Sequence, residues 1–262
     1  MVLFLFLAHL AVGIVFTLVF VSREAGVKFF RFNAGLAAIL LAVAFALRPS
    51  DTSSTDLGLV AVIALAVVEA ALIVYWATVG RALASIRPAI VATAVGAGLI
   101  ALMAQAVGQA SGLPAQAMTA ASFLSSAALL GGACTAMILG HWYLVIPSLQ
   151  VSHLQSIVKM HIASMVVRAV VVVAAVFMAI VSWQPGTGPS FRGYILSVSG
   201  IFFWQRVLFG LCGPGLLSYL TWETAKIRST QSATGILYVD FFTVVVGEVL
   251  AKYLLLATRV AL

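Results

Sequence analysis

Three of the four histidines in this sequence lie between positions 141 and 161, as His141, His153 and His161. The segments around His141 and His161 are otherwise strongly apolar, so each of these two imidazoles needs a polar partner. Neutral imidazole is a common axial ligand of haem iron inside helix bundles. The pattern therefore predicts a metal site in which His141 and His161 bind the iron of a b-type haem.

The expected depths of these two histidines agree with that prediction. If the flanking helices end where the apolar runs end, His141 lies about 13 Å and His161 about 8 Å from the same membrane surface. Gly131 and Gly132 would open a helix face to a flat macrocycle, and Arg168, on the same face as His161, could pair with a propionate or a quinone oxygen. The same glycines also suit plain helix packing, and each histidine also suits a structural hydrogen bond, so both interpretations stay open.

A second group of candidates is ionisable and lies inside apolar segments: Glu69, Arg168, Arg206, Asp240, Glu248 and Lys252. Isolated charges in lipid are costly, so such residues are expected to be paired or functional. Glu69, Arg206, Asp240 and Glu248 are therefore candidates for catalysis or proton transfer. The same charges could instead orient helices or hold a partner subunit.

A third signal follows Arg206, where Gly210, Gly213, Pro214 and Gly215 crowd into one apolar segment. Proline removes a backbone donor and glycine loosens a helix, so this cluster should weaken or break the helix. Broken membrane helices can bind ions or substrates through their backbone groups. A simple kink that allows tight packing is the competing interpretation.

Composition identifies the elements that must position these residues. Hydrophobic residues make up 63% of the 262 residues and charged residues only 8%, against about 45–50% and about 25% in soluble domains. Spanning segments of about 20 apolar residues must pair their backbone groups internally, which favours helices. We expect an all-α, polytopic integral membrane helical bundle that forms a single transmembrane domain over residues 1–262. Its eight predicted helices are 2–22, 31–47, 57–79, 88–107, 117–149, 156–182, 194–219 and 234–258.

The net charge of +7 comes from 14 lysines and arginines that are scattered singly rather than clustered, which argues against a nucleic-acid partner. Most of them fall in alternate loops or at their edges: Arg23, Lys28, Arg31, Arg81, Arg87, Lys159, Lys226 and Arg228. By the positive-inside rule these loops face the cytoplasm. Both termini are then outside, and we expect a bacterial inner membrane.

The sequence supports several functions. It contains no Walker loop, GxSxG elbow, HExxH, Rossmann fingerprint or CxxCH motif. The first hypothesis is a membrane electron-transfer subunit that holds haem b between helices five and six and works with quinone or protons through Arg168, Arg206 and Glu248. Its expected partners are the lipid bilayer and other membrane or electron-transfer subunits. The alternatives are a secondary transporter with a charged site at mid-membrane and a non-catalytic subunit of a larger complex.

Overall fold

A computed structural model describes residues 1–146, 149–183 and 190–262, and within these ranges the chain is helical with no strand. The described residues form ten α-helices, and a π-helical turn, Leu208–Cys212, joins α8 to α9. The helices are α1 Val2–Leu18, α2 Gly26–Ala46, α3 Asp56–Thr78, α4 Arg87–Gln109, α5 Leu113–Val145, α6 Val151–Val181, α7 Phe191–Ile195, α8 Ile201–Val207, α9 Gly213–Lys226 and α10 Thr230–Thr258.

Seven helical segments of the described residues are long and apolar enough to cross a membrane, and α1 is a shorter apolar helix beside them. The stretch Val198–Lys226, which contains α8, the π-turn and α9, counts as one of these segments. The prediction of an all-α polytopic membrane bundle is confirmed. Several boundaries differ from the predicted ones by a few residues. For example, α6 begins at Val151 rather than at 156, because Ser152, His153 and Gln155 are polar but do not interrupt a helix.

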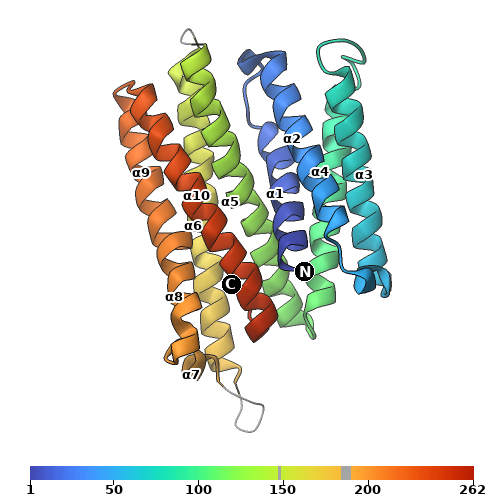
Figure 1. The fold of residues 1–262 in the computed structure, drawn as a ribbon, viewed down its shortest axis with the longest axis vertical. Helices are drawn as coiled ribbons and strands as arrows, with labels where there is room; N and C mark the ends of the chain where they lie inside the picture. Colours follow the sequence, from blue (N-terminus) through green and yellow to red (C-terminus); the bar gives the residue numbers. More distant parts are fainter. Residues whose placement is uncertain (147–148, 184–189) are drawn as a thin grey trace.

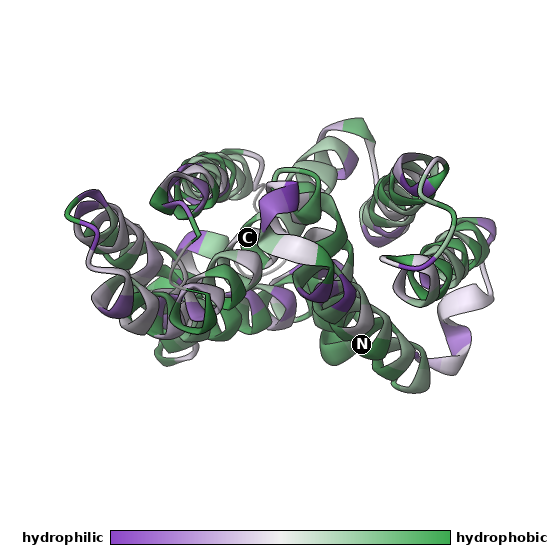
Figure 2. Cartoon of the chain, turned by 90° about the horizontal axis from the view of Figure 1, so that it is seen from above, coloured by the Kyte–Doolittle hydropathy of each residue, from purple (hydrophilic) through white to green (hydrophobic). Residues whose placement is uncertain are grey.

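The long helices run roughly parallel to one axis, with α1 and α5 in the middle of the bundle (Figure 1). The helices α2, α3 and α4 lie to one side of this pair, and α6, α8, α9 and α10 lie to the other. We call the end of the bundle where α1 begins and α10 ends the terminus side, and the other end the opposite side. The view along the helices shows mainly hydrophobic residues on the helix walls (Figure 2).

Large apolar side chains cover the outward face of α6. Val170, Val173 and Phe177 are 64%, 66% and 67% exposed. A continuous apolar face of this kind is stable against lipid tails and unfavourable against water. The chain is therefore an integral membrane protein whose surroundings are a lipid bilayer.

Two helix crossings depend on glycine. A Cβ atom on Gly13 of α1 would lie 2.0 Å from the backbone oxygen of Ala127, and one on Gly131 of α5 would lie 2.1 Å from the backbone of Gly13. A Cβ atom on Gly247 of α10 would likewise lie 2.2 Å from the Cα atom of Gly210 in the π-turn. Small residues let membrane helices approach this closely, so these positions fix how α5 meets α1 and how α10 meets the π-turn.

Candidate functional site

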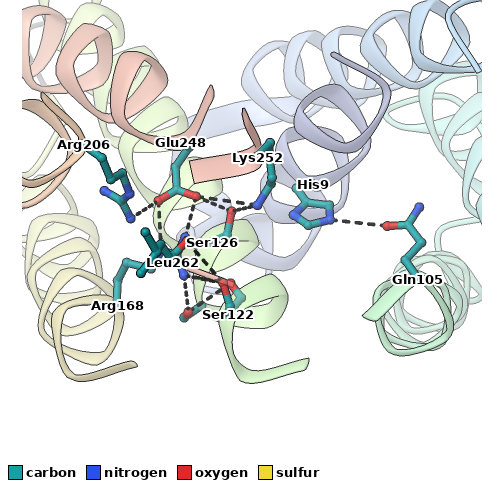
Figure 3. Close-up of polar contacts among 10 residues, drawn as sticks. His9, Gln105, Ser122, Ser126, Arg168, Arg206, Glu248, Lys252 and Leu262 are labelled. Atoms are coloured by element: carbon teal, nitrogen blue, oxygen red, sulfur yellow. Dashed lines mark hydrogen bonds and ion pairs between the residues drawn. The ribbon is translucent and has the colours of Figure 1, made fainter. Parts of the chain in front are cut away.

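Three buried basic residues, Arg168, Arg206 and Lys252, gather around Glu248 of α10 (Figure 3). Arg168 of α6 donates from Nε to Oε1 at 2.9 Å and from Nη2 to Oε2 at 3.0 Å. Arg206 of α8 donates from Nη2 to Oε1 at 2.9 Å, and Ser126 of α5 donates to Oε2 at 2.5 Å. The Nζ atom of Lys252 lies 3.7 Å from Oε2. We call Glu248, Arg168, Arg206, Lys252 and Ser126 the Glu248 cluster.

Arg168 uses its remaining donors on α5 and on the chain after α10. Its Nη1 atom donates to the Ser122 backbone oxygen at 3.0 Å, to Ser122 Oγ at 2.9 Å and to Ser125 Oγ at 3.3 Å. Its Nη2 atom also donates to the backbone oxygen of Leu262 at 2.7 Å. Every guanidinium nitrogen of this buried arginine therefore has a partner, which is what a stable buried cation requires.

Arg206 is bonded much less completely. It is fully buried, but its Nε and Nη1 atoms have no hydrogen-bond partner among the described residues. Its guanidinium lies beside two glycines. A Cβ atom added to Gly210 would lie 2.0 Å from Arg206 Nη1, and one added to Gly247 would lie 3.3 Å from the same nitrogen. Gly210, which was predicted to weaken this helix, thus makes room for the arginine together with Gly247 of α10.

The helix that contains Arg206 is not broken. It continues through the Gly and Pro cluster as the π-turn Leu208–Cys212, and α9 starts at Gly213 with Pro214 in its first turn. Pro214 has no N–H group and cannot donate a backbone hydrogen bond within a helix. The π-turn before it, with its wider i→i+5 hydrogen bonding, accommodates this missing donor. Where the sequence predicts a weakened or broken helix, the structure has a local change from α-helix to π-helix.

Lys252 links the Glu248 cluster to α1 and α4. Its Nζ atom donates to Ser126 Oγ at 2.7 Å and lies 5.2 Å from the centre of the Phe123 ring. The other partner of that ring is His9, in an edge-to-face contact at 4.6 Å. His9 Nε2 lies 3.3 Å from Gln105 Oε1 (Figure 3). A buried polar line therefore runs from the carboxylate of Glu248 to Gln105, interrupted by one aromatic ring.

The two proposed haem ligands each contact α10. His161 is fully buried and its Nε2 atom lies 2.7 Å from Asp240 Oδ2, in an ion pair when the imidazole is protonated. His141 is exposed, and its Nδ1 atom lies 3.0 Å from the hydroxyl of Tyr238. The described residues contain no group of three or more His, Cys, Asp or Glu that could hold a metal ion. Ligation of haem by His141 and His161 stays a prediction.

The glycines near these histidines are in contact with other parts of the bundle. A Cβ atom on Gly132 would lie 3.3 Å from His161 Nδ1, so this glycine makes room for the imidazole itself. The space where a Cβ atom of Gly131 would lie is filled by the backbone of α1. At Gly140 the same space is filled by Thr234 and Leu237 of α10. These contacts match the helix-packing interpretation of the glycines.

Glu69 lies apart from the other charges that were predicted at its depth. It is on α3, is partly exposed, and its Oε2 atom has no hydrogen-bond partner among the described residues. Arg168, Arg206 and Glu248 come together as expected. Ser122, Ser125 and Ser126 were not predicted as site residues, although their spacing on one apolar helix was a readable sign of a polar face.

Two cavities lie at the terminus side. The larger has a volume of about 990 Å³ and is bounded by the ends of α5 and α6, by α7 and by the chain after α10. The smaller, about 360 Å³, includes Gln105 of α4 in its wall. The Gln105 end of the polar line described above therefore reaches the smaller cavity.

Comparison with known proteins gives no relative for this chain. No family model, no curated protein and no solved structure matches it.

Proposed function

We propose that this chain is a secondary transporter that carries an anion, and that the Glu248 cluster is its substrate site. The supporting observation is the charge balance of the cluster. Three basic side chains, those of Arg168, Arg206 and Lys252, surround one side-chain carboxylate. When all three are protonated, the side chains of the cluster have two formal positive charges left over.

An excess of buried cations is costly inside a membrane, because each ion loses its hydration and only a nearby opposite charge offsets that loss. Glu248 already accepts from both arginines and from Ser126. Two nitrogens of Arg206 still have no partner among the residues that the structure describes. A bound anion would satisfy these donors and reduce the net charge, which gives the cluster affinity for negative substrates.

Lys252 provides a route to proton coupling. Arginine keeps its proton in proteins, whereas a buried lysine can release it. Nζ of Lys252 is bonded to Ser126 Oγ, which also binds Glu248. If a proton binds Lys252 when the anion binds and leaves when it leaves, transport of the anion is coupled to a proton gradient.

In this proposal the charged loops give the orientation of the chain in the membrane. With cationic loops in the cytoplasm, the terminus side faces outward, and its cavities open to the outside of a bacterial inner membrane. Cation–π contacts of Arg31 with Trp76 and of Lys159 and Lys226 with Trp222 lie toward the opposite side, where interfacial aromatic residues are expected.

The test is uptake by purified protein in proteoliposomes. Radiolabelled chloride, phosphate, acetate and phenylacetate are supplied separately, with protein-free liposomes as the background. We expect uptake of at least one anion, at least a ten-fold loss in Arg206→Gln, and wild-type rates in Arg81→Gln, whose side chain is exposed far from the cluster. Background rates for all four anions, or equal rates in wild type and Arg206→Gln, would overturn the proposal.

A further inference from the structure

The larger cavity, which we call the vestibule, lies one to two helical turns from residues that bind the Glu248 cluster. Thr119 of α5 lines the vestibule, and Ser122, one helical turn further along, binds Arg168. Ala175 of α6 also lines it, seven residues after Arg168 and on the same helix face. A molecule in the vestibule is therefore about 5–10 Å along these helices from the cluster.

A short segment separates the two sites. Arg259 has a left-handed conformation, with φ of +61°, and turns the chain back into the bundle after α10. Val260 and Ala261 then line the vestibule, while Leu262 is 1% exposed and its backbone oxygen accepts from Arg168. The same segment thus forms a wall of the vestibule on one side and holds the arginine on the other.

The lining of the vestibule indicates the kind of ligand that it suits. Phe191 and Tyr194 stack at an interplanar angle of 16°, and Met118 and Met178 add flexible apolar surface. Thr119 and Ser197 are among the residues that add hydroxyl groups, and none of the described lining residues is acidic. Burial raises the pKa of the Tyr194 hydroxyl, and the nearby Tyr253 raises it further, so this group stays neutral and does not repel an anion.

We infer that the vestibule is the terminus-side binding site for the body of an organic anion with an aromatic or similarly sized apolar group. This inference rests on the proposed anion transport by the Glu248 cluster. A volume of about 990 Å³ is at the upper end of the roughly 300–1,000 Å³ typical of pockets that enclose small organic ligands. An inorganic ion would gain nothing from stacked rings and methionines. Movement of residues 260–262 would then give the anionic group access to Arg168.

The experiment compares phenylacetate with acetate in the same proteoliposomes. Ala179→Trp fills the vestibule, and Val173→Trp places the same ring on the lipid-facing side of α6. We expect phenylacetate uptake to exceed acetate uptake at least ten-fold in wild type, to fall at least ten-fold in Ala179→Trp, and to stay unchanged in Val173→Trp. Uptake of acetate that depends on Arg206, without uptake of phenylacetate, would overturn this inference and leave the proposed function standing. No uptake of any anion would overturn both.

A labelling experiment covers the case in which Ala179→Trp does not fold. Cys134 and Cys212 are replaced by alanine, and Ser197→Cys introduces one thiol in the vestibule wall. Phenylacetate should slow the reaction of this thiol with a water-soluble maleimide at least three-fold, and acetate should not. Equal rates with and without phenylacetate would contradict the assignment of the vestibule.

Discussion

Arg168 and Glu248 face each other across the interior as a bidentate pair, with N–H···O distances of 2.9 and 3.0 Å. The same two helices, α6 and α10, also meet at a second pair. His161 lies seven residues before Arg168 on α6, and Asp240 lies eight residues before Glu248 on α10. Both helices run from the opposite side to the terminus side. Two buried pairs therefore set the register of two parallel helices.

The stability of the cluster should follow its charge balance. Removing Glu248 as Glu248→Gln leaves three buried cations without a counter-charge, so we expect the protein to lose about 3–5 kcal/mol. Lys252→Met removes one of the excess cations and should change stability by less than about 1 kcal/mol. Thermal unfolding of the purified variants in detergent measures both. Equal losses in the two variants would show that charge balance does not govern stability here.

The charge of Arg206, rather than its shape, should be the main requirement for transport. We expect Arg206→Lys, which keeps the positive charge, to transport the anion with a KM raised several-fold and a measurable maximal rate. Arg206→Gln should transport at background. Initial uptake rates over a range of anion concentrations separate the two effects. The hypothesis fails if the lysine and glutamine variants lose transport equally while both remain folded.

The contact between Gly13 and Gly131 should not tolerate a methyl group. Gly13→Ala would place Cβ 2.0 Å from the Ala127 backbone oxygen, so we expect a loss of about 1–3 kcal/mol from overpacking. Gly96→Ala in α4 is the matched control, because nothing lies within 4 Å of its Cβ position. That variant should be neutral or gain about 0.5–1 kcal/mol. Unfolding curves that shift equally for the two variants would contradict the packing at this crossing.

The haem hypothesis has a direct optical test. Because His161 Nε2 lies 2.7 Å from Asp240 and His141 is exposed, we expect oxidised and dithionite-reduced protein to show no Soret band. Expression in cells supplied with a haem precursor makes the test stringent. A Soret band that disappears in both His141→Ala and His161→Ala but persists in His153→Ala would support electron transfer and contradict our expectation.

The topology can be measured with single cysteines in a Cys134→Ala, Cys212→Ala background. Ser54→Cys lies on the terminus side and Ser85→Cys on the opposite side, and both positions are exposed. In intact cells stripped of any outer membrane, an impermeant maleimide should label Ser54→Cys and should label Ser85→Cys only after the cells are opened. The reverse pattern would place the vestibule on the cytoplasmic side.

Much of the fold follows from the sequence because lipid allows few solutions. Long apolar runs must be helices, and the buried charges of Arg168, Arg206 and Glu248 must find one another, as the structure confirms. Glu69 does not join these charges, although its depth along the helix predicts that it should. Residue counting gives the depth of a side chain along a helix but not the direction in which it points, and α3 carries Glu69 away from the cluster.

The partners in the cluster could not be assigned from spacing alone. Ser126 and Glu248 are 122 positions apart, and Arg168 and Leu262 are 94 apart. Such pairings depend on which helices become neighbours, which local patterns do not encode. The contact of His161 with Asp240 is of the same kind, because it joins residues of α6 and α10.

The crossing of α1 and α5 at Gly13 and Gly131 has one more consequence. Side chains can adjust by rotating, whereas two backbones in direct contact leave no such adjustment, so this crossing fixes the separation of the two helices. His9 lies one turn from Gly13 and meets Phe123 on α5. The crossing therefore acts as a spacer of constant length between the imidazole of His9 and the Phe123 ring that also contacts Lys252, whatever the surrounding lipid.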